Sequence, residues 1–152
     1  MIDSFRGPYG NFSNFVPCDV ELWGKRYPSV EHAYQSAKNN SEEWKVFCQT
    51  TVNPGALKRA ARNVQLVPNW EALKVQLMRN LVWQKFQQEP FKTLLLSTAD
   101  EYIQEGNWWG DTFWGVDFKS GKGQNVLGHI LMEIRTFFQQ GGLSDEGRDL
   151  GV

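Results

Sequence analysis

Two side chains that could do chemistry together, a carboxylate and an amine, lie in one predicted helix within YPSVEHAYQSAKNN, residues 27–40. Ser29 is placed to begin this helix, because a serine side chain can accept a hydrogen bond from an N–H group of the first turn. At 100° per residue, one face is apolar and carries Val30, Ala33 and Ala37. The adjacent face carries polar groups: Glu31, Tyr34, Gln35 and Lys38.

The spacing of Glu31 and Lys38, seven positions, places them roughly 10 Å apart along a helix axis. That distance is too long for a salt bridge, but it suits two groups that line one pocket. An ordinary amphipathic helix with a solvated polar face predicts the same spacing. The segment therefore needs support from the rest of the chain before it indicates a reaction.

A second informative segment is GNWWGDTFWGVDFKSGKGQNVLGH, residues 106–129. Trp108 and Trp109 lie between glycines, and Asp111 follows directly after Gly110. Glycines let a backbone approach a ligand closely, and tryptophans supply flat apolar area. A segment this long without regular periodicity is usually functional or disordered, and its aromatic content argues against disorder. It matches neither the GxxxxGK[ST] nor the GxGxxG phosphate motif.

A basic segment follows Asn53-Pro54, which predicts a helix start. Lys58, Arg59 and Arg62 then fall close together on one side of the helix. A helix start next to arginines can bind phosphate, and a solvated basic face is about equally consistent with the spacing.

Length and composition limit the class of protein. The 152 residues suffice for one domain with its own core, and the net charge of −1 argues against a strongly basic nucleic-acid binder, although a local basic patch remains open. We read Cys18 and Cys48 as reduced thiols in a cytoplasmic protein without a leader or membrane span. His32 and His129 lack ligand partners at useful spacing, so we expect no metal site and no cofactor.

The periodicity predicts an α+β fold that is mostly helical with a few short strands. We expect a hairpin over 19–27 turning at Gly24-Lys25, a helix over 41–50 with Trp44, Phe47 and Cys48 inward, and long helices over 70–88 and 124–140. A short strand is expected over 101–105. The domain should cover residues 1–140, and residues 141–152 should form a frayed polar tail.

Several motifs occur together in one order, and together they resemble the NADAR family. These are FSNF at 12–15, the run from Tyr27 to Lys38, Asn69-Trp70, the WGD tripeptide at 109–111 and the pattern Gly123-x-Asn125-x-x-Gly128. The resemblance covers roughly residues 9–138. It departs from the family pattern in a shorter connection between Arg62 and Trp70 and in the segment FWGVDFKS after Asp111.

The resemblance implies a metal-independent N-glycosidase that cleaves the bond between ribose C1 and a base nitrogen. It places three residues at the reacting centre: Glu31, Lys38 and Asp111. It implies substrate contacts from nine others: Phe12, Asn14, Phe15, Arg59, Arg62, Trp70, Trp109, Gly110 and Asn125. The family is associated with two substrate types, namely guanine bases that carry ADP-ribose and ribosylamino-pyrimidine phosphates of early riboflavin synthesis.

Between these substrates we favour ADP-ribosylated guanine, including guanine within DNA, because Phe113 and Trp114 add aromatic area on which a base can stack. Two other classes stay open. One is a module that binds ADP-ribose without cleaving it, and the other is a helical interaction domain whose tryptophans are core residues. We expect a monomer or weak oligomer with no membrane partner.

Overall fold

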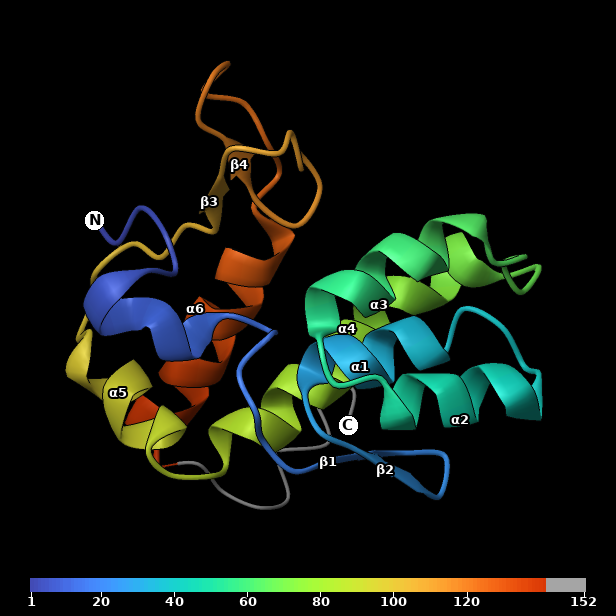
Figure 1. The fold of residues 1–152 in the computed structure, drawn as a ribbon. Coiled ribbons are helices and arrows are strands. Elements are labelled where there is room, and N and C mark those ends of the chain that lie inside the picture. Colours follow the sequence, from blue (N-terminus) through green and yellow to red (C-terminus); the bar gives the residue numbers. More distant parts are fainter. Residues whose placement is uncertain (142–152) are drawn as a thin grey trace. The chain divides into compact units, whose positions relative to one another are not determined.

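The computed structural model describes residues 1–141 and confirms an α+β fold that is mostly helical (Figure 1). Its helices are η1 Gly7–Phe12, α1 Val30–Ser36, α2 Glu42–Thr50, α3 Pro54–Ala60, η2 Ala61–Asn63, α4 Trp70–Phe86, α5 Phe91–Ser97 and α6 Val126–Gln139. Its strands are β1 Val20–Leu22, β2 Lys25–Tyr27, β3 Gly106–Asn107 and β4 Val116–Asp117.

The described residues form two compact units. The first unit comprises residues 1–13 and 86–141, and the second unit comprises residues 14–85. The extent of a single domain over residues 1–140 stays a prediction, and the predicted tail lies, apart from Gly141, outside the described residues. No helix within residues 1–141 is long and apolar enough to cross a membrane, and the cytoplasmic location stays a prediction.

The second unit begins with the predicted hairpin. Strands β1 and β2 pair antiparallel, with Val20 opposite Tyr27. The turn consists of Trp23 and Gly24, whose φ angles are +52° and +83°, so it lies one residue earlier than predicted. Positive φ at both central residues matches the right-handed twist of the strands that the turn connects.

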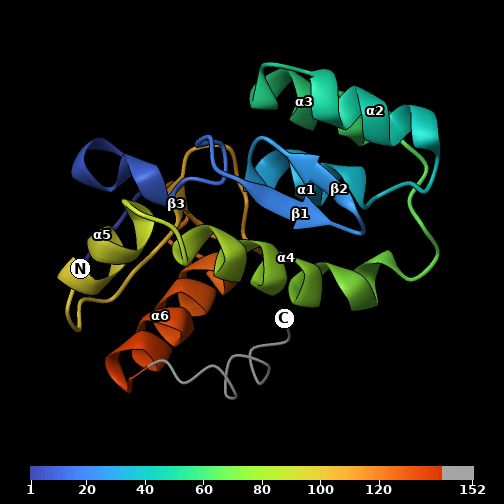
Figure 2. The ribbon, with the colours of Figure 1, turned by 90° about the horizontal axis from the view of Figure 1, so that it is seen from below.

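Helix α1 is the central element of the second unit. The Ser29 hydroxyl accepts a hydrogen bond from the backbone N–H of His32, as predicted for the helix start. The helix contacts α2, α3 and both strands of the hairpin, which surround it in Figures 1 and 2. All seven of its residues are buried, so α1 is not an amphipathic helix with a solvated polar face.

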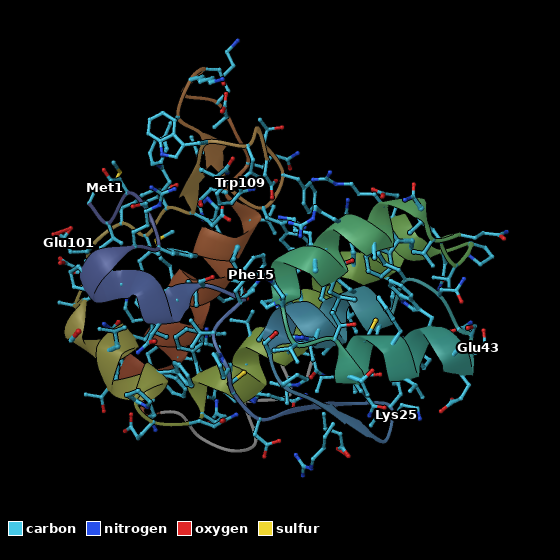
Figure 3. The ribbon with its side chains drawn as sticks, viewed as in Figure 1. Met1, Phe15, Lys25, Glu43, Glu101 and Trp109 are labelled. Carbon is cyan, nitrogen blue, oxygen red and sulfur yellow. The ribbon has the colours of Figure 1, made fainter. Side chains whose placement is uncertain are left out.

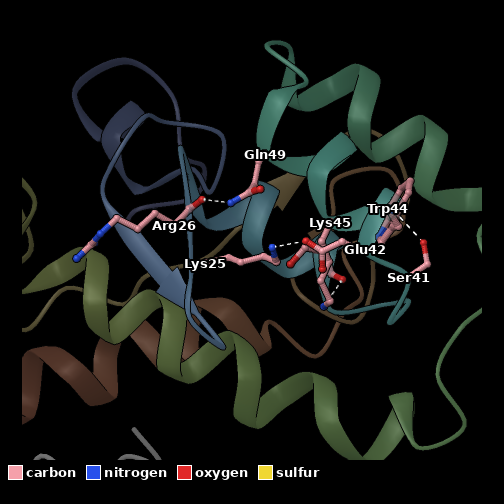
Figure 4. Close-up of polar contacts among 8 residues, drawn as sticks. Lys25, Arg26, Ser41, Glu42, Trp44, Lys45 and Gln49 are labelled. Atoms are coloured by element: carbon pink, nitrogen blue, oxygen red, sulfur yellow. Dashed lines mark hydrogen bonds and ion pairs between the residues drawn. The ribbon is translucent and has the colours of Figure 1, made fainter.

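Helices α2 and α3 begin at the predicted caps. The Ser41 hydroxyl accepts from the N–H of Trp44, and the Asn53 side chain accepts from the first turn of α3. Figure 4 shows two contacts that join α2 to the hairpin: Lys25 with Glu42, and the Gln49 amide with the carbonyl of Arg26. The prediction that Phe47 faces inward is wrong, because 43% of its surface is exposed.

The first unit contains η1, α5, α6 and the parallel pair of β3 and β4. Helix α6 packs against α5, which packs against η1. The strand predicted over 101–105 is reduced to one bridge between Ile2 and Ile103. Nearby, the N-terminal amine lies 2.7 Å from the Glu101 carboxylate, and both residues are labelled in Figure 3.

Close backbone packing holds the chain between β3 and the start of α6. A β-carbon added at Gly115 would overlap both the carbonyl and the carboxylate of Glu105. The carbonyl of Gly115 in turn accepts a hydrogen bond from the N–H of Asn125, the residue before α6. Glycine at position 115 is therefore a packing requirement.

We expect Gly115→Ala to destabilise the protein by roughly 1–3 kcal/mol, because the main chain of Glu105 would have to move. Thermal unfolding followed by circular dichroism measures this change. The matched control is Gly10→Ala, since nothing lies within 4 Å of a β-carbon added there. Equal melting temperatures for the two variants would contradict the packing argument.

Candidate active site

Glu31 is held in the first turn of α1 by local contacts. Its backbone N–H donates to the carbonyl of Asn14 over 3.0 Å, which satisfies one of the free donors of a helix start. The side chain is buried, with 6% of the residue exposed. One turn further on, the Gln35 amide donates a hydrogen bond to Glu31 Oε2. The carboxyl group therefore has a fixed place inside the second unit.

Burial raises the pKa of Glu31, because a low-dielectric surrounding disfavours the carboxylate. The hydrogen bond from Gln35 and the positive charges of Lys58 and Lys38 act in the opposite direction and are outweighed. A carboxylic acid that keeps its proton to a higher pH than usual is suited to donate that proton to a leaving group.

Lys38 lies two residues beyond the last residue of α1, after the cap residue Ala37, and not within the helix as predicted. Its Nζ lies 5.5 Å from the ring centroid of Tyr34 and 5.7 Å from that of Trp70, within the range of a cation–π contact. Burial lowers the pKa of Lys38, and the nearby Glu31 opposes this shift. A lowered pKa increases the fraction of neutral amine, which is the nucleophilic form.

Trp70 has a different setting from the one predicted for a wall against a planar base. It is 5% exposed, and its ring packs 5.2 Å from that of Tyr34. In this structure the indole supports the Lys38 amine. Contact between Trp70 and a base stays a prediction.

The basic side chains of the second unit divide by exposure. Arg59 and Arg62 are exposed, whereas Lys58 is half-buried, and its Nζ lies 5.9 Å from the ring centroid of Phe15. Among the lysines that act on the pKa of Glu31, Lys58 has the larger effect. The sequence identified Lys58 as part of the basic side of this helix, but it gave no sign of its effect on Glu31. Phosphate contacts of the two arginines stay predictions.

In the first unit, the carboxylate of Asp111 organises its own loop. Asp111 Oδ1 accepts from the backbone N–H groups of Phe113 and Trp114, each over 3.0 Å. Asn107 exchanges two further hydrogen bonds with the backbone of Asp111. Both of these hydrogen bonds use Oδ1, and the residue is half-buried.

The tryptophans beside Asp111 are on the surface of the first unit. Trp108 is 55% and Trp109 is 59% exposed, and Figure 3 shows Trp109 on the loop that follows β3. Gly110 connects them to Asp111 with a φ of +82°, which only glycine adopts without strain. This exposure contradicts the alternative in which these tryptophans are core residues.

Two predicted substrate contacts of the first unit are enclosed by protein. Phe12 is 1% exposed and packs against Tyr9 and Phe86. Asn125 is 2% exposed, and its amide donates to the carbonyl of Ile103 and accepts from the N–H of Glu105. Both side chains support the surrounding fold, and their contact with substrate stays a prediction.

The histidine on α1 has a structural task, as expected. His32 Nε2 donates to the carbonyl of Thr51 over 2.7 Å, and Nδ1 lies 2.6 Å from the Ser29 hydroxyl. Within the part of the chain that the structure describes, no three His, Cys, Asp or Glu side chains are grouped so as to hold a metal ion. Independence from a metal stays a prediction.

Comparison with known proteins defines the class of this α+β fold. The NADAR domain family matches residues 3–139. N-glycosidase YbiA of Shigella boydii is 38% identical over 130 residues, which cover 84% of this chain and 80% of that protein. The NMR structure of YbiA from Escherichia coli superposes with a TM-score of 0.79 at 33% identity, covering 95% of this chain and 90% of that one.

The chain therefore belongs to the NADAR family. These relationships confirm the predicted enzyme class, an N-glycosidase, which is a hydrolase of N-glycosyl compounds. A riboflavin biosynthesis protein of Vibrio vulnificus is also similar, with 33% identity over 135 residues. That match covers 87% of this chain and 36% of the longer protein.

We expect Glu31→Gln to raise the melting temperature at neutral pH. The folded-state pKa of Glu31 lies above the unfolded value, so its contribution to stability is present below the unfolded pKa and is lost as pH rises through the folded pKa. A glutamine at position 31 has no charge, so this loss of stability does not occur. Its side-chain oxygen can still accept the hydrogen bond from Gln35. Each kcal/mol corresponds to about 2–4 °C in a chain of this size.

Thermal unfolding of both proteins from pH 4 to pH 8 measures this difference. The gain from Glu31→Gln should shrink toward pH 4, where wild-type Glu31 is protonated in both states. Glu43→Gln, an exposed substitution on α2, serves as the control. A gain that is independent of pH would contradict a raised pKa.

Proposed function

We propose that this N-glycosidase hydrolyses the bond between ribose C1 and a base nitrogen, with Glu31 as the central catalytic acid. The observation that carries this proposal is the buried carboxyl of Glu31, whose pKa is raised by burial while two lysines act on it electrostatically. Burial of a carboxyl group costs stability, and a catalytic role is one reason for a protein to keep such a group.

The reaction needs a proton on the leaving nitrogen and stabilisation of the positive charge that develops at C1. In the proposed mechanism, neutral Glu31 donates its proton to the base nitrogen as the C1–N bond breaks. The resulting carboxylate then stabilises the sugar cation, and a water oxygen adds to C1. The proton of that water passes to a base, and the family resemblance makes Asp111 the candidate for this role.

Lys38 has two proposed roles. As an ammonium ion it holds an anionic group of the substrate. As a neutral amine it attacks C1 of the ring-opened ribose, the base nitrogen leaves with a proton, and water hydrolyses the resulting imine to free aldehyde and amine. The lowered pKa of Lys38 supports the second role.

For the substrate we propose guanine bases that carry ADP-ribose, including those within DNA. The support is the pair of exposed tryptophans in the first unit, Trp108 and Trp109, which offer stacking area to a base or to a neighbouring nucleotide. The exposed Arg59 and Arg62 suit a pyrophosphate.

A second candidate is a ribosylamino-pyrimidine phosphate of early riboflavin synthesis. A specific observation favours it, because relatives from Vibrio vulnificus and Zea mays are named riboflavin biosynthesis proteins. A module that binds ADP-ribose without cleavage is a third candidate, supported by the same arginines and tryptophans.

The deciding experiment incubates the protein with ADP-ribosylated DNA and, separately, with the riboflavin precursor, and detects released ADP-ribose or base by mass spectrometry. We expect release from the DNA. Release from the precursor alone would overturn the substrate proposal, and calorimetric binding of ADP-ribose without any release would favour the binding module.

In the same assay, we expect Glu31→Gln and Asp111→Asn each to lower turnover by on the order of 10²–10⁴. Glu43→Gln and Asp100→Asn are the controls, since both residues are exposed. Near-normal turnover in folded Glu31→Gln would remove that residue from the mechanism.

The role of Lys38 can be tested by trapping. If Lys38 forms an imine, borohydride added during turnover reduces it to a stable amine, and the mass of the protein increases by the reduced sugar fragment. We expect the mass of the wild-type protein to increase. The mass of Lys38→Arg, which keeps the charge but forms no imine, should not change. Untrapped wild-type protein during active turnover would restrict Lys38 to an electrostatic role.

A further inference from the structure

The side chain of Gln35 is buried beside Glu31 and has one unmatched end. It is 3% exposed, and its Nε2 donates to Glu31 Oε2. Within residues 1–141 its Oε1 is also buried and has no hydrogen-bond partner. Buried polar atoms are nearly always paired, so an unmatched amide oxygen next to an ionisable group needs a reason.

The two protonation states of Glu31 need different hydrogen-bond partners. A carboxylate only accepts hydrogen bonds and therefore needs the N–H end of the amide. A carboxylic acid has an O–H that must donate, and the amide oxygen is an acceptor for it. A rotation of the terminal amide exchanges the two ends, so one glutamine can serve both states.

The backbone of Gln35 is held in place by two hydrogen bonds to its carbonyl. The Trp44 indole N–H donates to the Gln35 carbonyl over 2.9 Å, and the Lys38 N–H donates to the same carbonyl over 3.2 Å. Since Gln35 also lies within a fully buried helix, its side chain has little freedom except at the terminal amide.

We propose that Gln35 is the positioning residue of Glu31, and that it holds the carboxyl group in one orientation through both the protonated and the ionised state. This rests on the proposed role of Glu31 in the reaction. An acid that donates its proton and then stabilises a cation must not rotate away between the two steps. Gln35 provides that restraint without touching the substrate.

Other charged or titratable groups also act on Glu31. These are Lys58 on α3, Lys38 beyond the end of α1 and His32 on α1. Lys74 on α4 acts on Lys38. All of them remain in a Gln35 variant, so a change in the titration of Glu31 there reports the lost hydrogen bond.

The first test needs no substrate. In wild-type protein, NMR follows the side-chain carboxyl carbon of Glu31 and the side-chain amide of Gln35 through a pH titration. We expect both to change with one shared midpoint, because the amide responds to the proton on Glu31. A Gln35 amide that does not respond at the midpoint of Glu31 would overturn the proposal, whether or not the enzyme has the proposed substrate.

The second test removes the amide. Gln35→Met keeps the length of the side chain but cannot replace the hydrogen bond of Gln35 to either form of Glu31. The midpoint of Glu31 should still move to higher pH, because a hydrogen bond to the ionised carboxylate is stronger than one from the neutral acid. Turnover should fall on the order of ten- to a hundredfold with little change in KM. The pH limb of kcat set by Glu31 should move in the same direction.

Gln49→Met is the matched control, since Gln49 donates to the carbonyl of Arg26 in the same unit. If Gln35→Met fails to fold, Gln35→Glu replaces it, and the two neighbouring carboxyls should raise the upper midpoint of the pair. A folded Gln35 variant with an unchanged Glu31 midpoint and only a lower melting temperature would show a purely structural role.

Discussion

The burial of Glu31 within a helix that contacts protein on all sides is the constraint on which the candidate site depends. Helix α1 has seven residues, all buried, and α2, α3 and the hairpin surround it. A carboxyl group in that place cannot be solvated freely, so its proton affinity is set by the few groups around it. The elements of the second unit thus determine the chemistry of one side chain.

The helix that carries this buried group is short, and other contacts support it. A seven-residue helix is only marginally stable by itself, so α1 depends on its cap and on tertiary contacts. Ser29 provides the cap, and the Asn14 carbonyl accepts the N–H of Glu31. Natural proteins tolerate unfavourable groups at functional sites, because the remaining fold supplies the stability that those groups reduce.

Local chemistry made much of this fold predictable. Ser29, Ser41 and Asn53 cap the helices that their positions predict, because capping depends on residues within one turn. Long-range packing was not predictable in the same way. The solvated face considered for α1 is absent because other elements cover it, whereas Phe47, expected inside, lies on an uncovered face of α2.

In the candidate site, too, local features were predictable from the sequence and the effects of long-range packing were not. Helical spacing predicted Glu31 and Lys38 on one helix, but α1 ends at Ser36 and Lys38 lies in the turn after it. The spacing also did not indicate the burial that shifts the pKa values of both groups. Lys58 was recognised as basic, yet only the fold brings its charge to bear on Glu31. Trp70 was chosen by type as a stacking surface, and its near-complete burial follows from packing against Tyr34.

Burial raises the pKa of Glu31 and lowers the pKa of Lys38, so the two opposite shifts have the same physical cause. Burial favours the neutral form of each group, and the attraction between their charges favours the ionised forms. In the proposed reaction, an anionic substrate that paired with Lys58 or Lys38 would screen the positive charge that favours the carboxylate. Its binding would then move Glu31 toward the protonated acid, the form that the proposed mechanism needs.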